Sequence, residues 1–435
     1  MAKINVRQRN NPLKKIIKEA EKSLKPHKLK SFKSYINMFY SEISKTNFIK
    51  HPPIELFNRA HHAWLHSKER KSNTPSVQVF NPILSMHGFK SNNTIIEVIT
   101  EDMPFLVSSI SSALNDEGLT IHFLVHPTIY VRRSEDCKIL DFMELPDPKF
   151  NSKKESVIHL EITRQTEPQL KKIKNTLELI LKNILCYMND KNAITNHITT
   201  IIEDIHPIPK GFKIEEISEV QEFVSWLLDS NFIFLGCREY NLVKKNRSAE
   251  LMMDENRNLG ILGDPKYCVF KSGEKTDAHS PEIQKFQHYN DIILVTKTNV
   301  RSIIDRTVHM DAIGIKKFDK KGDVVGHRLF VGLFTQTSYN QPNSHIPLLR
   351  RRLKMTIEAA GFAPASYNNN SLKNILESYP RDELFQINDS TLLNTAIGIL
   401  ELESRPRPAL FIREDELGQF CSCLVYIPRE RYNTE

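Results

Sequence analysis

The sequence predicts an α+β protein of several domains, and three observations lead to this expectation. The 435 residues correspond to about two to four domains of ordinary size. Hydrophobic residues make up 40% and charged residues 26%, which is typical of globular rather than disordered chains. Strand-like runs alternate with amphipathic helices, as in antiparallel sheets covered by helices. No run of roughly 18 uncharged apolar residues occurs, so no membrane-spanning helix is expected.

Residues 1–75 are expected to form a basic helical lead-in rather than an independent domain. The first 40 residues hold eleven Lys and Arg against two Glu, whereas the remainder is nearly neutral. Such an arm could bind nucleic acid or anionic lipid. Apolar residues recur in it at helical spacing, at Ile16, Ile17, Ala20 and Leu24. We therefore expect one helix face to dock on protein and the basic face to be solvated, with no nucleic-acid or membrane partner.

Residues 76–206 carry the clearest pattern of the chain. The expected elements are a strand, a helix, two strands and a long helix, over Thr94–Thr100, 102–117, 119–125, 157–163 and 170–188. We expect the first helix to begin at Asp102 as its N-cap, with Pro104 in the first turn, and to stop at Gly118. Helices covering one face of a small, mostly antiparallel sheet would be the natural packing.

Residues 207–345 form the second expected unit, an antiparallel α+β layout. A helix over 215–229 precedes four strand-like runs, FIFLGCREYNLV, DIILVTKTN, DAIGIKKFD and VVGHRLFVGLFT. Residues 346–404 are expected to be helical, with Gly361 ending the first helix. Residues 405–435 hold two strand-like runs, which we expect to begin a further α+β unit. The chain is thus expected to be the front part of a longer protein.

The turn at Asp102 resembles a known motif. Asp102-x-Pro104, a helix and then GLTI is similar to the ACT domain, a small-molecule-sensing βαββαβ module. The resemblance implies an amino-acid site with Asp102, Met103 and Pro104 as its wall, and a helix N-terminus there would attract a carboxylate. The alternative is that Asp102 only caps the helix. Phe105, which stands where the motif usually has glycine, favours that alternative.

A wider set of motifs resembles the N-terminal region of the large bacterial NAD-specific glutamate dehydrogenases. In chain order they are VFNP, EDMPFLVSSISSALNDEGLTIHFLVHP, FIFLGCREY, LGIL, TKTNVRSIIDRTVHMDAIGIKKFD, IPLLRRRL, NILESYPRDELFQI and SCLVYIPRERYNTE. The resemblance implies an ACT-like module, then a PAS-like module, a helical segment and the start of another ACT-like unit. It also implies a homo-oligomeric enzyme that uses NAD to convert glutamate to 2-oxoglutarate and ammonia.

This chain by itself is expected to be non-catalytic. Hydride transfer to NAD requires a dinucleotide fold with a Gly-rich turn, and the sequence has neither G-x-G-x-x-G nor G-x-x-x-x-G-K-[ST]. The turn LGILGD, with Gly260 and Gly263, is expected to be a strand connection. In the resembled family the dehydrogenase portion lies later in the chain. We therefore expect no catalytic residue and no NAD or metal bound here.

The leading hypothesis is a regulatory and assembly region whose partner is the dehydrogenase portion of the same enzyme. The chain would then be a fragment, a split gene product or a truncated one. The alternative is a stand-alone ACT/PAS-type sensor that binds an amino-acid effector. A cytoplasmic location is expected for either, because the arm lacks the apolar core of a secretory signal and the six cysteines are scattered.

Candidate metal ligands are few. Cys421 and Cys423 would share one face of a strand, with Ser422 opposite, and two further ligands are not in evidence. They are expected to be buried small residues. His62 and His66 share a helix face but lack the glutamate of H-E-x-x-H, and their helix is expected simply to pack.

Two charged runs leave alternatives open. YPRDELF, at 379–385, could form an interdomain salt-bridged hinge or contact the missing catalytic part of the enzyme. It could equally start a helix with a solvated charged face and buried Leu384 and Phe385. The arginine run at 350–352 is expected to be a solvated helix face rather than an anion site.

Overall fold

The computed structural model forms two compact units, which are described separately. Unit 1 comprises Met1–Leu185 and Ile303–Thr307, and unit 2 comprises Cys186–Ser302 and Val308–Glu435. Both combine helices with antiparallel sheets, so the predicted α+β class is confirmed. The finer division into five domains stays a prediction. The structure describes residues 6–41, 43, 48, 51–71, 74–146, 152–205, 209–245, 248–270, 291–415 and 420–432.

Unit 1 is built on a six-stranded antiparallel sheet with the order β1-β2-β6-β4-β5, and β3 also pairs with β6. Its strands are β1 (Ser76–Phe80), β2 (Asn93–Glu101), β3 (Ile121–Val125), β4 (Thr128–Arg133), β5 (Ile139–Met143) and β6 (Lys153–Thr163). The central strands β2 and β6 are rich in β-branched residues and buried on both faces. The sequence patterns predicted β2, β3 and β6 but not the partly exposed β1, β4 and β5. The expected βαββαβ order therefore left out three strands of this sheet.

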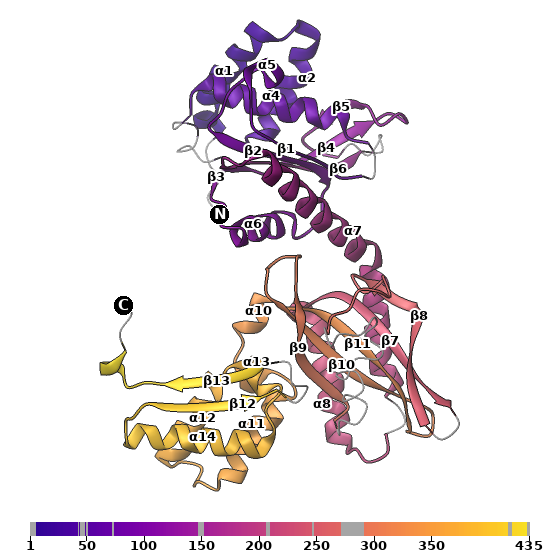
Figure 1. Cartoon of the computed structure of the whole chain (residues 1–435), viewed down its shortest axis with the longest axis vertical. Coiled ribbons are helices and arrows are strands. Elements are labelled where there is room, and N and C mark those ends of the chain that lie inside the picture. The colour runs from indigo at the N-terminus through magenta and orange to yellow at the C-terminus, as the bar shows by residue number, and fades with distance from the viewer. Residues whose placement is uncertain are drawn as a thin grey trace. The chain divides into compact units, whose positions relative to one another are not determined.

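Helices cover both faces of this sheet, not only the one face expected (Figure 1). One face carries α6 (Leu106–Asp116) and the start of α7 (Glu167–Asp204), and the other carries α1 (Val6–Ser23), α2 (Pro26–Phe39) and α4 (Pro53–Glu69). A single turn, α5 (Leu84–His87), follows β1.

Helix α1 docks through one face, as predicted for the basic lead-in. Ile16 and Ala20 are buried in a core shared with α2, α4 and the sheet, whereas Lys14, Lys15 and Lys18 are exposed. No helix in the described part of the chain is long and apolar enough to cross a bilayer, the 38-residue α7 included.

Helix α6 begins at Leu106, so the prediction that Asp102 caps it was wrong. The N-cap position is Phe105, whose φ of 68° and ψ of 0° lie in the left-handed region. Glycine adopts this conformation without steric cost, whereas other residues lose roughly 1–2 kcal/mol. The left-handed backbone at this position is therefore a reason why the motif usually has glycine there. At the other end, Gly118 is left-handed at φ 71°, as the predicted stop requires.

Unit 2 is built on a five-stranded antiparallel sheet with the order β8-β7-β11-β10-β9. Its strands are β7 (Phe232–Lys245), β8 (Ser248–Gly260), β9 (Ile293–Arg301), β10 (His309–Phe318) and β11 (Val324–Phe334). Only β8 was not predicted, because its sequence is rich in turn-forming residues. The core beside this sheet contains apolar residues of α8 (Ile214–Trp226) and of the last turns of α7. A π turn, η1 (Leu227–Asn231), joins α8 to β7.

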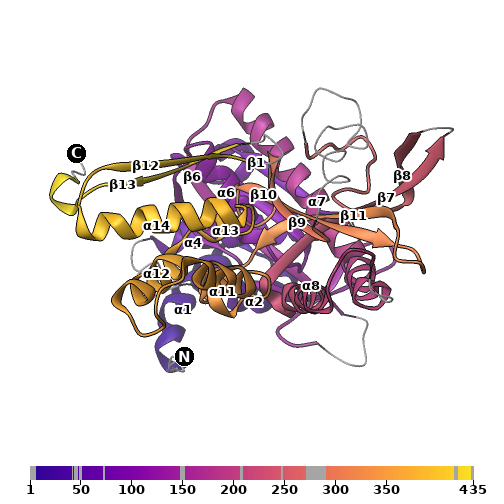
Figure 2. The ribbon, with the colours of Figure 1, turned by 90° about the horizontal axis from the view of Figure 1, so that it is seen from below.

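A helical segment and a hairpin complete unit 2. The elements are α10 (Gln336–Tyr339), η3 (Asn343–His345), α11 (Leu349–Ala360), α12 (Tyr367–Ser378), α13 (Arg381–Leu384), α14 (Asp389–Ser404), β12 (Ala409–Glu414), β13 (Cys421–Tyr426) and η4 (Arg429–Arg431). Gly361 ends α11 at φ 68°, as predicted. The β12-β13 hairpin lies along α14 (Figures 1 and 2). Phe411 packs on Gly398 of α14, where an added Cβ would lie 2.9 Å from the ring.

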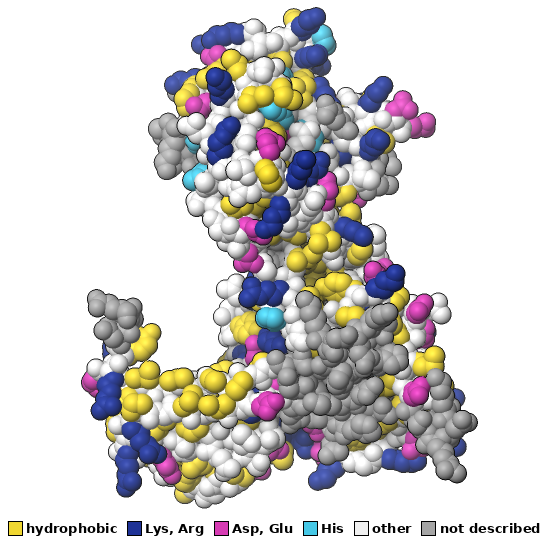
Figure 3. Space-filling model, viewed as in Figure 1, with side chains coloured by type: hydrophobic (Ala, Val, Ile, Leu, Met, Phe, Trp, Pro, Cys, Tyr) yellow, Lys and Arg dark blue, Asp and Glu magenta, His cyan; other side chains and the backbone are white. Residues whose placement is uncertain are grey.

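The outer face of this hairpin is apolar and exposed. Leu410, Ile412 and Val425 are 56%, 61% and 61% exposed, and Figure 3 shows hydrophobic side chains gathered along the hairpin. Cys421 and Cys423 share this face, as strand periodicity predicted, but they are exposed. The prediction that they are buried was wrong, because periodicity groups residues by face without telling which face is covered.

A fully buried carboxylate links α4 to the sheet of unit 1. Glu97 on β2 lies 3.0 Å from Nδ1 of His62, 3.2 Å from Nδ1 of His66 and 3.1 Å from Nδ1 of His159 on β6. The second nitrogen of His66, Nε2, lies 2.8 Å from the Ser76 hydroxyl. His62 and His66 were expected only to pack, but they bind a carboxylate that is distant in the sequence.

These contacts shift the pKa values of Glu97 and His159. Burial would raise the pKa of Glu97, but hydrogen bonds from the three histidines outweigh it and hold that pKa well below its usual range. Burial would lower the pKa of His159, but Glu161 and Glu97 outweigh it and raise that pKa. Arg59 forms an ion pair with Glu161. The cluster therefore favours a charged His159.

We expect the chain to lose stability as the pH rises above the usual titration range of histidine. A raised folded pKa stabilises the fold fully below the unfolded value of about 6.5, and this contribution is lost as the pH rises through the folded pKa. Urea unfolding between about pH 5.5 and 9 should show the decline, and His159→Gln should flatten it. The exposed His122→Gln is the control. An unchanged decline in His159→Gln would contradict the assignment.

Candidate functional site

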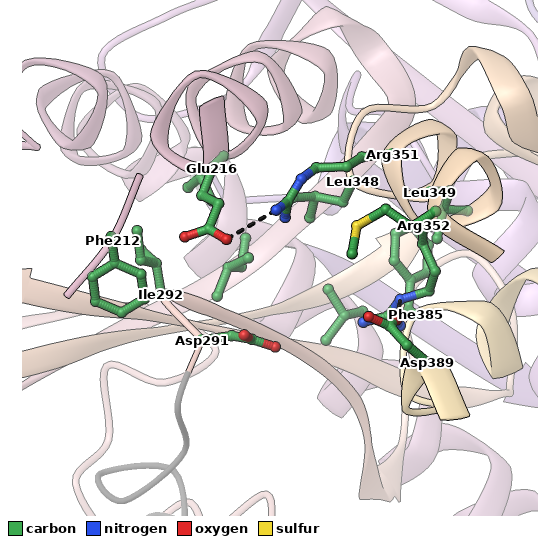
Figure 4. Close-up of a pocket in the computed structure, with 14 residues that line it drawn as sticks. Phe212, Glu216, Asp291, Ile292, Leu348, Leu349, Arg351, Arg352, Phe385 and Asp389 are labelled. Carbon is green, nitrogen blue, oxygen red and sulfur yellow. Dashed lines mark hydrogen bonds and ion pairs between the residues drawn. The ribbon is translucent and has the colours of Figure 1, made fainter. Parts of the chain in front are cut away.

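A cavity of about 230 Å³ in unit 2 is the candidate functional site (Figure 4). It is lined by residues of α8, β9, α11, the start of α14 and the segments beside them. Pockets for drug-sized ligands measure roughly 300–1,000 Å³, so this one suits a small metabolite.

Apolar side chains form the floor of the cavity. β9 contributes Ile293 and Val295, which face the same way because strand side chains alternate. α8 contributes Val220, α11 contributes Leu349, and Phe385 closes one side. All five belong to the buried core of unit 2. The floor is therefore close-packed and preformed.

Charged side chains form the rim. Nη2 of Arg351 on α11 donates to Oε1 of Glu216 on α8 at 2.9 Å. Nε of Arg352 lies 3.2 Å from Oδ1 of Asp389, the first residue of α14. The fifth charged residue is Asp291, two residues before β9. Although this side chain is exposed, desolvation beside the cavity raises its pKa more than the charge of Arg352 lowers it.

The arginines at 350–352 are half-buried and paired with acids, so the predicted solvated face is only partly solvated. Arg350 lies 2.9 Å from Glu219 and 2.5 Å from Glu222, while Arg351 binds Glu216. Residues 216, 219 and 222 recur at a spacing of three and form one acidic stripe on α8. The spacing of the acids is visible in the sequence, but their pairing with α11 needs the tertiary fold.

The short helix α13, within YPRDELF, connects separate parts of unit 2. Arg381 is buried and donates to the backbone carbonyls of Ser338 and Gln341. Asp382 lies 2.9 Å from Nζ of Lys297 on β9. A solvated charged face was one of the two open alternatives, and it does not describe Arg381.

Glu383 and Arg413 give α13 its third connection. Nη2 of Arg413, on β12, donates to Oε2 of Glu383 at 2.9 Å, and both side chains are largely buried. The predicted burial of Leu384 and Phe385 is confirmed. The turn that starts after Pro380 and the burial of Leu384 and Phe385 match the second alternative, except that the charged side chains form ion pairs inside unit 2. A hinge between domains or a contact with the catalytic part stays a prediction.

The three residues predicted to line an amino-acid site lie at the β2–α6 turn of unit 1. Asp102 accepts hydrogen bonds from Lys154 Nζ and Ser156 Oγ, both at 2.6 Å. Burial would raise the pKa of Asp102, but these bonds outweigh it and lower that pKa. Met103 is buried and Pro104 is exposed. The role of these residues as a ligand site stays a prediction.

The LGILGD turn is a packed strand connection, as expected. Gly260 has a φ of 63°, and an added Cβ would lie 2.2 Å from the carbonyl oxygen of Leu235. Its N–H donates to the carboxylate of Asp190 at 2.7 Å. Because an acid already accepts this N–H, a phosphate would meet like charge there. Among the described residues, no group of three or more His, Cys, Asp or Glu is arranged to hold a metal ion.

Three family models match this chain, and all describe glutamate dehydrogenase. The ACT1 domain matches residues 35–177, helical motif 1 matches 346–405, and the ACT2 domain matches 409–435. The NAD-specific glutamate dehydrogenase of Halomonas elongata is 32% identical over 427 residues, 97% of this chain. The chain is related to the N-terminal region of the NAD-specific glutamate dehydrogenases.

Other NAD-specific glutamate dehydrogenases show the same relation. The Pseudomonas aeruginosa protein is 28% identical over 404 residues, and the Mycobacterium tuberculosis protein is 24% identical over 343 residues. These matches cover 92% and 78% of this chain. The chain spans only 26%, 25% and 20% of the lengths of the three relatives.

The matched glutamate dehydrogenase segments correspond to elements described above. The ACT1 match contains the sheet of unit 1 and the turn at Asp102. The helical motif contains α11 to α14, and with them Arg351, Arg352 and Asp389 of the cavity rim. The ACT2 match contains the β12-β13 hairpin.

Removing Glu383 is expected to destabilise the chain strongly. Glu383→Ala removes the carboxylate paired with the guanidinium of Arg413, whose side chain is only 11% exposed, and should lower the free energy of unfolding by about 3–5 kcal/mol. Denaturant unfolding measures the loss, and adding Arg413→Met should restore part of it. Glu358→Ala, at an exposed position of α11, is the control and should change stability by about 0.5 kcal/mol or less. A loss for Glu383→Ala no larger than that of the control would refute the buried pair.

Proposed function

We propose that this chain is a regulatory and assembly region of an NAD-specific glutamate dehydrogenase. The observation that carries the proposal is a match over 97% of the chain to about a quarter of such an enzyme. A dinucleotide site uses a parallel sheet with a Gly-rich turn, whereas the sheets of the described residues are antiparallel. Under this proposal, glutamate oxidation and NAD binding belong to the dehydrogenase portion of the enzyme.

The proposal assigns the parts of the chain as follows. The ACT1 match supports a sensing module in unit 1. The five-stranded antiparallel sheet of unit 2, preceded by α8, supports a PAS-like module. The exposed apolar face of the β12-β13 hairpin supports an assembly role, because apolar patches often mark contact with other protein. The partners would be the dehydrogenase portion and further copies of the chain, in the cytoplasm.

The purified 435-residue chain is expected neither to oxidise glutamate nor to bind NAD. Absorbance of NADH at saturating glutamate and NAD should show no turnover, and NAD should not raise the melting temperature. The full-length Halomonas elongata enzyme is the positive control. Turnover by the chain alone would mean that a nucleotide site exists in it, and the proposal would be abandoned.

The alternative is a stand-alone amino-acid sensor that uses the turn at Asp102, Met103 and Pro104. It predicts stabilisation by an amino acid that is lost in Asp102→Asn but kept in Asp116→Asn, an exposed control at the end of α6. Under the leading proposal with Asp102 engaged by Lys154, we expect Asp102→Asn to leave any such stabilisation unchanged. Thermal-shift screening of amino acids with the three proteins decides between the two.

A further inference from the structure

Unit 1 carries exposed lysines that lack an acidic partner among the described residues. They lie on the outer sides of α1 and α2, because the apolar side of each helix packs into the core of unit 1. Two lysines do pair with glutamates, Lys22 with Glu19 and Lys33 with Glu21. The other lysines of this region are exposed, form no ion pair with a described residue and are called the lysine surface: Lys14, Lys15, Lys18, Lys25, Lys28 and Lys30.

Lys68 on α4 adds to the positive charge beside the lysine surface. Its Nζ lies 3.2 Å from the centroid of the Trp64 ring, so the ammonium group is placed over an aromatic face. Burial and, to a smaller degree, the charge of Lys28 lower the pKa of Lys68 to about 8. The fold therefore brings cations of α2 and α4 together at a cost that a bound anion would reduce.

Exposed apolar side chains lie beside these cations. Leu65 is 40% exposed and precedes Lys68 by three residues, so the two side chains share a face of α4. α4 contacts α5 through His62 and His87, whose ring centroids are 5.7 Å apart. Figure 3 shows hydrophobic side chains beside Lys and Arg at the end of unit 1 that holds α1, α2 and α5 in Figure 1. Two apolar side chains of α5 are exposed by 59% and 76%, Leu84 and Met86.

We propose that this part of unit 1 binds the surface of an anionic lipid bilayer. The lysine surface would face the lipid phosphates, while Leu84 and Met86 would enter the interface between headgroups and acyl chains. Anionic leaflets attract basic segments, and exposed apolar side chains next to such segments strengthen the attachment. The binding is peripheral, because α1 and α2 keep their apolar sides packed on the core.

This inference goes beyond the regulatory function proposed above and does not depend on it. From the sequence we expected the basic face of residues 1–75 to be solvated and without a membrane partner. The sequence shows the charge of that face, but not that Lys68 adds to it, nor that α5 exposes apolar side chains near it. These two additions distinguish an interfacial surface from one that is only solvated.

Nucleic acid suits this surface less well. Single strands are bound by stacking their bases on exposed aromatic side chains, whereas Phe32, Tyr35 and Phe39 of α2 are buried. Bases in a duplex are read chiefly by planar, bidentate groups such as arginine, whereas the cations of this surface are lysines. A phosphate backbone would also leave the apolar side chains of α5 exposed to water.

The test is sedimentation of the 435-residue chain with lipid vesicles. One set contains phosphatidylcholine alone, and the other is a mixture with the anionic phosphatidylglycerol. We expect binding to the anionic vesicles only. Binding should weaken as salt is raised from about 0.1 M to about 1 M, because the Debye length then falls from about 10 Å to about 3 Å.

Charge reversal on α1 should weaken this binding about a hundredfold. The variant combines Lys14→Glu, Lys15→Glu and Lys18→Glu, and each lysine near an anionic bilayer contributes about a factor of five. Met86→Ser keeps every charge and should weaken binding severalfold, because its apolar contact with the interface is lost.

The matched control reverses exposed lysines of α7, which contributes nothing to the proposed surface: Lys171→Glu, Lys182→Glu and Lys191→Glu. This control has the same net charge as the α1 variant and should bind as the unchanged chain does. Circular dichroism of each variant establishes that it is folded.

The proposal is overturned by the absence of any preference for anionic vesicles, by equal losses in the α1 and α7 variants, or by undiminished binding of Met86→Ser. A mixed-sequence DNA duplex is the competing probe. If the chain bound this duplex more tightly than the vesicles, the surface would belong to nucleic acid and the proposal would also fall.

Discussion

Buried carboxylates on central strands dictate how helices meet the sheets in both units. In unit 1, Glu97, Glu155 and Glu161 are at most 2% exposed, and each is matched by histidine or arginine side chains. In unit 2, Glu239 on β7 lies 3.2 Å from His197 of α7. A buried charge without a partner costs several kcal/mol, so helix and sheet must meet where the charges match. Apolar contacts alone would tolerate more variation in packing.

The same principle shapes the cavity of unit 2. One ion pair between α8 and α11 and another between α11 and α14 connect its walls at separate points. Each ion pair joins elements that are distant in sequence. The apolar floor of the cavity belongs to the buried core, whereas the ion pairs lie at its rim. The ion pairs therefore fix the walls of the cavity without occupying its volume.

The sequence was informative where one element determines its own pattern. Runs of β-branched residues located β2 and β6, apolar periodicity located α7, and glycines located the ends of α6 and α11. The sequence was not informative where structure depends on a second element. β8 forms a strand because it pairs with β7, and Cys421 would be buried only if another layer covered its face of the hairpin. Phe105 shows a third limit, because its left-handed backbone is not visible in its residue type. The cavity could not be predicted, since Glu216, Asp291 and Arg352 converge only through the fold.

Gly398 has a consequence for protein engineering. A glycine inside a helix is a standard target for replacement by alanine, which usually adds about 1 kcal/mol of stability. Here the ring of Phe411 occupies the space that a Cβ at position 398 would need, and this ring packs the hairpin against α14. The routine substitution would push the ring outward and loosen the hairpin. At this position a residue with higher helix propensity would therefore weaken the contact between α14 and the hairpin.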